Sequence, residues 1–376
     1  MIKRLFFSVW CMLLFLLAMA QQPIITISNP LAVEREEVVV EIPWTQVMAS
    51  YPQLDTTHFK VINAGTKKGY PFQLEYRGNK EVQNLLVQVS VPAKGRVQLS
   101  LVKGKRDVFA PKTFCRFVPE RKDDFAWEND RIAHRMYGKA LEKTPKELAY
   151  GVDVWVKRTD KLVINERYKR GKYHEDAGDG LDYYHVGLTL GAGGIAPYIN
   201  DTIWYAGTYS DWRIWDNGPL RSTFQLQYDV WTAAGRKVKM TNTISIDAGS
   251  QLSQNRVLFE TTDTLPLPFV TGIIKRKEAG AMLLNEAAGL MAYWEPQHGE
   301  DGTTGVACLL TTPVARIAVN KEQLLAVSTA QKEKEIIYYN GAAWDKGGKI
   351  TSANSWFNYL QQFGDRLKNP LSISIK

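Results

Sequence analysis

The sequence lacks most of the signatures that would identify an enzyme class directly. It has 3 cysteines and 5 histidines in 376 residues, and no CxxC pair, which excludes a zinc site built on paired cysteines. It contains no GxSxG motif, no HExxH motif and no P-loop, so the common nucleophile elbow, zinc-protease helix and nucleotide loop are excluded. It also has no long block of consecutive lysines and arginines. We therefore do not expect nucleic acid as a partner.

Long apolar runs are also scarce, and the one that exists lies at the N-terminus. Lys3 and Arg4 precede an apolar stretch over residues 5–17, and residues 18–20 read Ala-Met-Ala. This pattern predicts a secretory signal peptide over residues 1–20, because the run is too short for a spanning helix and ends in a small-x-small cleavage site. We expect an exported protein, periplasmic or secreted after cleavage near Ala20, without stable membrane insertion.

The charge balance favours an anionic partner. The chain carries 47 basic and 39 acidic residues, and cleavage would remove two basic ones, leaving 45 − 39 = +6. A mildly basic exported protein suits an acidic polysaccharide or oligosaccharide. A charge this small, spread over the whole chain, is equally compatible with no charged ligand at all.

Two cysteines remain after cleavage, Cys115 and Cys308. In an oxidising compartment they could form a disulfide. Their separation in the sequence does not show whether they meet, and two unpaired buried thiols are the alternative.

Alternating strand patterns predict an all-β protein. Residues 24–103 contain six or seven short β-branched segments separated by glycine, proline and asparagine turns, which predicts a small β-sandwich over residues 21–110. From residue 117 onward the strand-like segments are longer, two-faced and richer in tryptophan, as in antiparallel sheets. Residues 117–376 therefore predict a large antiparallel assembly of two packed sheets. One helix is expected near the C-terminus, at 352–367.

The stretch FVPERKDDFAWENDRIAHRMYG, residues 117–138, is dense in charge. If residues 129–137 form one strand, Arg131, Arg135 and Tyr137 share a face, and His134 lies among apolar residues on the other. Two arginines on one face can bind a carboxylate or sulfate. The alternative is a solvated sheet face on which the arginines pair with carboxylates. His134 is better explained as a core histidine.

A second polar stretch, KYHEDAGDGLDYYHVG, spans residues 172–187. Its glycines indicate a loop, and its histidines, His174 and His185, are candidates for acid–base chemistry near neutral pH. Asp176, Asp179 and Asp182 could bind a divalent cation such as Ca²⁺, although their spacing is not that of an EF-hand. The alternative is a solvated polar loop.

Three further segments combine aromatic and polar side chains. Residues 209–221 contain Trp212, Arg213 and Arg221, a mixture that suits recognition of a sugar carboxylate but also an edge strand entering a turn. Residues 293–302 add Glu295 and His298 in another polar loop, and residues 338–348 add a tryptophan and a lysine.

Several of these motifs together resemble a known family. FVPERKDDFAWENDRIAHRMYG, GVDVWVKR, YHEDAGDGLDYYHVG, WDNGPLR and IDAGSQLSQNRV are similar to exported bacterial proteins catalogued as domain of unknown function 4861. The resemblance covers nearly all of the mature chain. It implies a β supersandwich like that of galactose mutarotases and several polysaccharide lyases. It also implies a place in polysaccharide-utilisation loci of Bacteroidota, whose neighbouring proteins often handle pectin and other uronic-acid glycans.

Residues and resemblance together favour an enzyme on uronic-acid-containing, pectin-like glycans, most readily a lyase. Such an enzyme needs a cation for the uronate carboxylate, a base for the C5 proton and an acid for the leaving oxygen. The catalytic candidates are His174, His185, Tyr137 and Glu128. The substrate-binding candidates are Arg131, Arg135, Trp127, Trp212, Arg213, Arg221 and His298. No cofactor is expected, apart from a divalent cation such as Ca²⁺, for which Asp176, Asp179 and Asp182 are the candidate ligands.

Three alternatives remain open. A glycoside hydrolase needs two carboxylates flanking the bond, for which Glu128 or Asp130 with Asp176 or Asp179 are candidates. A mutarotase-like enzyme needs one acid and one base, such as His185 with Glu295. A non-catalytic glycan-binding module needs the aromatic residues and arginines but neither histidine.

Overall fold

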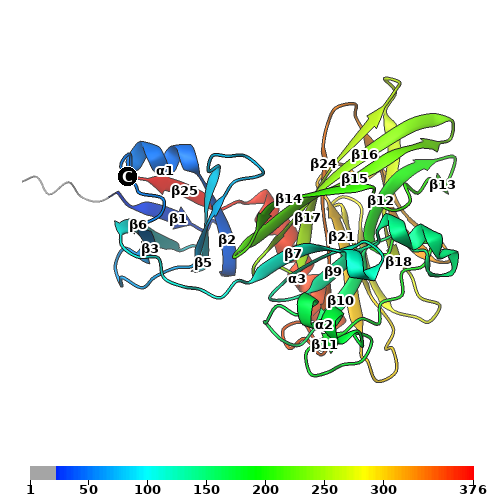
Figure 1. Cartoon of the computed structure of the whole chain (residues 1–376), viewed down its shortest axis with the longest axis horizontal. Helices are drawn as coiled ribbons and strands as arrows, with labels where there is room; N and C mark the ends of the chain where they lie inside the picture. The colour runs from blue at the N-terminus through cyan, green and yellow to red at the C-terminus, as the bar shows by residue number, and fades with distance from the viewer. Residues whose placement is uncertain (1–22) are drawn as a thin grey trace, which may run out of the picture.

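The computed structural model describes residues 23–376, and this part of the chain is mostly β, as the sequence predicts (Figure 1). The expected signal peptide lies outside the described residues. The α-helices are α1 (Trp44–Ser50), α2 (Ile164–Arg170) and α3 (Ala353–Lys368). Within residues 23–376, no helix is both long and apolar enough to cross a membrane.

A small sandwich forms from the N-terminal strands. One sheet has the order β25-β1-β6-β3 and the other β2-β5-β4. The strands are β1 (Ile25–Ser28), β2 (Arg35–Pro43), β3 (Phe59–Asn63), β4 (Phe72–Glu75), β5 (Asn84–Val91), β6 (Arg96–Lys103) and β25 (Ser372–Ile375). Alternate residues of these strands, such as Ile25, Val40 and Leu99, meet in a core of their own.

The C-terminal strand belongs to this small sandwich, whereas the sequence pattern places residues 117–376 in the large unit. Strand β25 pairs antiparallel with β1, with Ile25 opposite Ile375, and Figure 1 shows it (red) among the blue N-terminal strands. Four residues carry too little pattern to reveal a partner more than three hundred positions away. The return of β25 ties the two units together.

The large unit contains three antiparallel sheets. Their orders are β11-β10-β9-β8-β7, β13-β12-β18-β23-β22 and β14-β15-β16-β17-β24-β21-β20-β19. The first sheet consists of β7 (Thr113–Val118), β8 (Asp124–Asn129), β9 (Ala133–Met136), β10 (Asp153–Lys157) and β11 (Gly180–Leu181). The second consists of β12 (Ala192–Ile199), β13 (Thr202–Ile203), β18 (Leu267–Ile274), β22 (Arg316–Val319) and β23 (Gln323–Ala330). The third consists of β14 (Asp211–Asn217), β15 (Arg221–Ala233), β16 (Arg236–Asp247), β17 (Leu252–Thr261), β19 (Ala281–Asn285), β20 (Leu290–Trp294), β21 (Thr304–Leu310) and β24 (Ile336–Trp344).

The main core lies between the eight-stranded sheet and the two five-stranded sheets. Phe125 and Trp127 of β8 meet Phe224 of β15 there, with ring centroids 4.3 Å and 5.2 Å apart. Cys115 and Cys308 are both buried in this core as free thiols. The opposite face of β8, β9 and β10 is covered by α2. Alternation along these strands therefore separates an apolar inner face from an outer face that mixes apolar side chains, such as Trp155, with charged ones, such as Arg135.

The expected strand at 129–137 is shorter than the pattern suggests, which moves Arg131. Asn129 Oδ1 accepts hydrogen bonds from the backbone N–H groups of Arg131, at 2.8 Å, and Ile132, at 3.0 Å. This local turn is a typical use of an asparagine side chain. Strand β9 begins only at Ala133, so Arg131 and Arg135 do not share a strand face.

His134 is a core residue, as the sequence indicates. Its ring stacks on Trp127 with centroids 5.3 Å apart, and its Nδ1 lies 3.2 Å from the carbonyl oxygen of Asp153. Burial lowers the pKa of His134 to about 4, so the imidazole is neutral at physiological pH. The expected C-terminal helix is also confirmed, and Ser352 caps it by accepting a hydrogen bond from the Ser355 backbone.

Candidate functional site

Three loops that are far apart in the sequence meet at one end of the large sandwich. Strands β20, β21 and β24 are neighbours, with Trp294 opposite Gly305 and Thr304 opposite Trp344. This register gathers the residues after β20, before β21 and after β24 at one sheet edge. The loop after β11 joins them through Tyr183, whose Oη lies 2.6 Å from Thr304 Oγ1. We call this group of loops (residues 182–187, 295–304 and 344–346) the loop cluster.

An ion pair lies in the loop cluster, between Glu295 and Arg276. Arg276 donates from Nε to Glu295 Oε1 at 2.9 Å and from Nη1 to the His185 carbonyl at 2.9 Å. Its guanidinium also lies 4.7 Å from the Tyr184 ring centre. Glu295 is only 6% exposed, and burial raises its pKa to about 7 despite the opposing charge of Arg276. The carboxyl group is therefore partly protonated near neutral pH.

An accessible histidine stands beside this ion pair. The His298 side chain is 66% exposed, stacks on the Tyr183 ring at 5.2 Å and lies 3.0 Å from Asp301 through Nδ1. His298 is close enough for its charge to influence the pKa of Glu295. An open imidazole next to a carboxyl that titrates near pH 7 gives a base and an acid in one place.

A second arginine borders the loop cluster at Trp344. The Arg158 guanidinium lies 4.9 Å from the Trp344 ring centre and pairs with Asp176. Trp344 Nε1 in turn donates to the Asp301 carbonyl at 2.8 Å. The loop cluster thus has two arginines at its border, Arg158 and Arg276, and a planar guanidinium suits a sugar carboxylate.

Other predicted site residues converge at a different place, on the outer face of β9 and β10. Arg135 forms ion pairs with Asp153 at 2.5 Å, Asp182 at 3.0 Å and Asp124 at 3.5 Å. Its guanidinium also lies 5.0 Å from the Tyr137 ring centre. We call these five residues the aspartate–arginine cluster.

The aspartate–arginine cluster is sealed. Each of its five side chains is buried. Besides Arg135, the charges of Arg121 and Arg167 oppose the effect of burial on Asp124 and Asp182 respectively. Burial, together with the charge of Asp153, raises the pKa of Asp182 to about 8, and burial raises the pKa of Asp124 to about 6. His174 lies at the surface beside it, with Nδ1 2.8 Å from the Asp182 carbonyl. Arg135 is therefore enclosed by carboxylates of the protein itself and is out of reach of a substrate carboxylate, contrary to the sequence-based assignment.

Glu128 and Trp127 are structural, which corrects their assignment to the site. Glu128 is fully buried and accepts hydrogen bonds from the backbone N–H groups of Val163 and Ile164, at 2.8 and 2.7 Å, at the start of α2. Lys157 Nζ binds the same carboxylate at 2.7 Å. Trp127 is fully buried in the main core, so it offers no ring face to a sugar.

The remaining arginine candidates join the two units instead of lining the loop cluster. Arg131 pairs with Glu37, and Arg221 pairs with Glu41 at 2.8 Å. Arg213 donates to the Gly78 carbonyl at 3.0 Å. Trp212, from the same segment as Arg213 and Arg221, stacks on Phe117 with ring centroids 5.1 Å apart.

The three aspartates considered for a cation do not converge. Asp176 Oδ1 accepts hydrogen bonds from the Gly178 and Gly180 backbone, both at 2.9 Å, while Asp179 pairs with Arg170 at 3.2 Å. Asp182 belongs to the aspartate–arginine cluster. Across residues 23–376, no group of three or more His, Cys, Asp or Glu side chains is arranged to hold a metal ion.

Arg276 and Arg158 are residues of the candidate site that the sequence pattern does not single out. Arg276 lies in the run KRKE, where nothing in the pattern separates it from the two adjacent lysines. Arg158 follows β10 as one more charge after a strand. Only the spatial neighbours Glu295 and Trp344 distinguish these arginines, and those contacts depend on strand pairing across the whole large unit.

Comparison with known proteins places the chain in a family. The profile described as "Domain of unknown function (DUF4861)" matches residues 27–373, as the sequence motifs predict. "Uncharacterized protein P7" of Formosa agariphila is 29% identical over 384 aligned positions, which cover 95% of this chain and 94% of that protein.

Solved structures share the fold at low identity. An alpha-mannosidase from Enterococcus faecalis V583 aligns with a TM-score of 0.51 and 9% identity, over 94% of this chain and 46% of that one. A glycosyl hydrolase family 38 protein from Enterococcus faecalis aligns with a TM-score of 0.50 and 10% identity, over 94% of this chain and 47% of that one. The chain thus spans less than half the length of either structure, and the likeness is one of fold. By the match across residues 27–373, the protein belongs to the DUF4861 family.

Proposed function

We propose that the protein is a carbohydrate-active enzyme on uronic-acid-containing glycans and that the loop cluster is its active site. The observation that carries the proposal is the pairing of buried Glu295, whose pKa is raised by burial to about 7, with exposed His298. Proton transfer to and from a sugar at neutral pH needs such a pair. The fold shared with a mannosidase supports the general class, because similar sandwiches serve sugar enzymes, but it does not specify the reaction.

The reaction that fits these residues best is β-elimination by a lyase. Arg158 or Arg276 binds the uronate carboxylate and stabilises the charge that develops on it. His298 removes the C5 proton, the C5 electron pair forms the C4–C5 double bond, and the C4–oxygen bond breaks. Glu295, in its protonated form, gives its proton to the leaving oxygen. No water is consumed, and the products are an unsaturated uronate and a new hydroxyl end.

A hydrolase is the second candidate because more than one carboxylate lies near the same aromatic ring. Burial raises the pKa of Tyr183, and the negative charges of Glu295, Asp345 and Asp301 add to this effect. Two carboxyl groups on either side of a glycosidic bond are what hydrolysis requires. This reaction consumes water and gives only saturated products.

The test is a product scan with the mature chain, residues 21–376. Oligosaccharides of galacturonate and of glucuronate are incubated with the wild type, with and without chelator, while the ultraviolet absorbance of unsaturated uronate is followed and products are separated. The same scan is run with His298→Ala and with the control His58→Ala, which changes an exposed histidine of the small sandwich.

A lyase gives rising absorbance that is lost in His298→Ala and kept in His58→Ala. New products without absorbance would replace the lyase by the hydrolase. Absence of any product on oligosaccharides that the protein binds would refute an enzyme and leave a glycan-binding module.

A further inference from the structure

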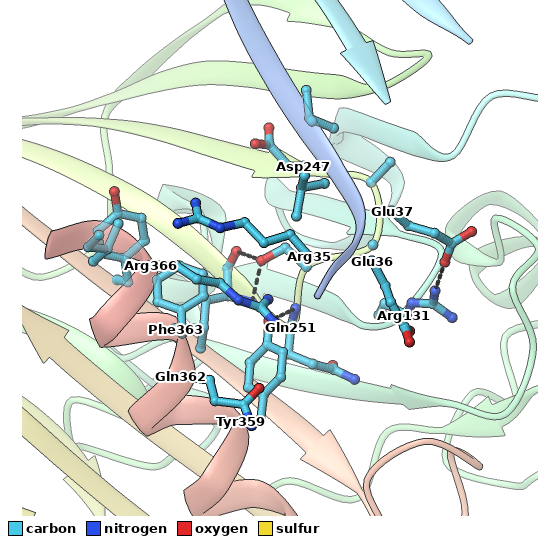
Figure 2. Close-up of a pocket in the computed structure, with 18 of the residues that line it drawn as sticks. Arg35, Glu36, Glu37, Arg131, Asp247, Gln251, Tyr359, Gln362, Phe363 and Arg366 are labelled. Carbon is cyan, nitrogen blue, oxygen red and sulfur yellow. Dashed lines mark hydrogen bonds and ion pairs between the residues drawn. The ribbon is translucent and has the colours of Figure 1, made fainter. Parts of the chain in front are cut away.

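A cavity of about 880 Å³ lies between the two units, away from the loop cluster. Its walls are β2 of the small sandwich, helix α3, and residues 247–252 of the large unit. Figure 2 shows labelled side chains of β2 and α3 around this space, with Glu37 of β2 turned toward Arg131. The volume is that of an ordinary ligand site, and a domain interface is a common location for one.

Two arginines of this cavity have no carboxylate partner. Other cations of the wall are neutralised, as Arg131 is by Glu37. Arg35 binds Asn29 Oδ1 at 3.1 Å and the Asn369 carbonyl, and Arg366 reaches only the Glu34 carbonyl, at 3.5 Å. Within residues 23–376 neither arginine forms an ion pair. Burial and the nearby charge of Arg366 lower the pKa of Arg35, so the two guanidinium groups repel each other where an anion would stabilise both.

An unsatisfied acceptor lines the same cavity. The Gln251 side chain is 9% exposed, and its Oε1 is buried without a hydrogen-bond partner. Its backbone N–H donates to Tyr359 Oη at 3.0 Å, which fixes the residue against α3. An unpaired buried acceptor destabilises the fold unless something donates to it. Because Gln251 lines the cavity, a hydroxyl group there would do so once the side-chain amide turns toward it.

The cavity also offers an apolar wall for a ring. Phe363 of α3 and Tyr339 of β24 both line it, with ring centroids 5.0 Å apart. Aromatic faces stack on the C–H faces of sugars. A lone phosphate or sulfate would leave this wall and the Gln251 acceptor unused.

We infer that the cavity is a second glycan-binding site for an acidic sugar unit, separate from the loop cluster. The oxyanion of the sugar, a carboxylate or a sulfate ester, lies between Arg35 and Arg366. A sugar hydroxyl donates to Gln251 Oε1, and the ring rests against Phe363. The inference shares its ligand class with the proposed function but does not require the loop cluster to be catalytic.

The test is calorimetric titration of the mature chain, residues 21–376. The probes are a galacturonate oligosaccharide, a sulfated galactan oligosaccharide and a neutral galactan oligosaccharide of equal length. The first variant is Arg366→Gln, because Arg366 is partly exposed and its loss should not unfold the chain. The matched control is Arg256→Gln, which removes the same charge from an exposed arginine paired with Glu335. A second variant, Gln251→Met, removes the acceptor and keeps the shape.

We expect one or both acidic probes to bind and the neutral probe to bind at least tenfold more weakly. Arg366→Gln should weaken binding by about tenfold or more, the value of a charge-assisted hydrogen bond, and Arg256→Gln should not. The acidic probe that binds identifies carboxylate or sulfate as the anion. The inference would be overturned if both arginine variants weakened binding equally. It would also be overturned if Gln251→Met and Arg366→Gln both bound as tightly as the wild type, or if neither acidic probe bound.

Failure of this site and failure of the proposed function are distinguishable. The titrations are repeated in His298→Ala, where the proposed reaction is lost and cavity binding should remain. Arg366→Gln should in turn keep its turnover of short oligosaccharides. Binding lost in His298→Ala but kept in Arg366→Gln would place the ligand at the loop cluster and overturn the second site.

Discussion

The loop cluster and the aspartate–arginine cluster are built from the same kinds of side chain but differ in access. Each holds an arginine against carboxyl groups whose pKa is raised by burial, as for Glu295 and Asp182. In the aspartate–arginine cluster three carboxylates surround Arg135 and every group is buried. In the loop cluster Arg276 has one carboxylate partner, and exposed His298 stands beside it.

This difference teaches that a shifted pKa by itself does not locate chemistry. Perturbed carboxyl groups occur both in active sites and in structural ion-pair networks. Each region has an exposed histidine beside it, His298 or His174. What separates the two regions is access to the arginine, because the Arg276 side chain is 22% exposed and the Arg135 side chain is 5% exposed. Matched substitutions in the two regions test this comparison, beginning with the largest expected effect.

Changing a carboxyl group to an amide should abolish activity when the group is Glu295 and not when it is Asp182. Glu295→Gln removes the proposed acid, so turnover of a uronate oligosaccharide should fall by about 10²- to 10⁴-fold. Asp182→Asn, the matched change in the sealed cluster, should leave turnover within a few-fold of the wild type. Steady-state kinetics on the active substrate measures both. The reverse order of effects would move the active site to the aspartate–arginine cluster.

Removing Arg135 from the aspartate–arginine cluster should destabilise the protein more than removing Arg276 from the loop cluster. Arg135→Met removes the ion-pair partner shared by three buried carboxyl groups, and we expect the free energy of unfolding to fall by about 3–5 kcal/mol. Arg276→Met leaves only Glu295, which can take up a proton near neutral pH, so the loss should be smaller. Urea unfolding of both variants gives the comparison. Equal losses would mean that the two arginines have the same structural role.

The pH dependence of turnover should follow Glu295. Burial raises its pKa to about 7, and the proposed acid must be protonated, so turnover should fall as the pH rises through about 7. The residual activity of Glu295→Gln should not fall as the pH rises through about 7. Turnover rates measured across neutral pH provide the test, and a rate that increases through pH 7 would make Glu295 a base instead.

The pH dependence of stability should follow Asp182. Because burial raises its folded pKa from 3.8 to about 8, the folded protein holds this proton more tightly than the unfolded chain. Its contribution to stability is therefore complete below about pH 4 and is lost as the pH rises through about 8. Relative to the wild type, Asp182→Asn should become more stable over that interval.

A control for this prediction has the opposite sign. The hydrogen bond from Arg236 lowers the pKa of Asp263, so Asp263→Asn should become less favourable relative to the wild type as the pH rises through the acid range. Urea unfolding at several pH values checks both variants. The Asp182 prediction would be wrong if the difference between Asp182→Asn and the wild type did not change with pH.

Local patterns in the sequence predict the fold class, the C-terminal helix and the core position of His134. They fail where a single side chain or a distant partner decides the outcome. Asn129 turns the chain and interrupts the strand that would have placed Arg131 beside Arg135. Strand β25 finds its partner β1 at the other end of the chain, a pairing that four residues cannot encode visibly.

The site was predictable in parts but not as a whole. Residues 172–187, 293–302 and 338–348 stand out in the sequence as polar, aromatic loops, and these are the segments that meet. Their meeting depends on the register that puts Thr304 opposite Trp344 and on the contact of Tyr183 with Thr304. Burial of Glu128 and Trp127 is equally a consequence of packing, because catalytic and structural carboxylates look alike in a sequence.

The measurement that tests the central claim most directly is histidine nuclear magnetic resonance during titration with a uronate oligosaccharide. The chain has 5 histidines, with His298 in the loop cluster, His174 beside the aspartate–arginine cluster and His58 in the small sandwich. Imidazole signals are assigned by single histidine substitutions. The account predicts that His298 shifts with saturating ligand while His174 and His58 do not. A shift of His174 with His298 unchanged would contradict it and place the substrate at the other cluster.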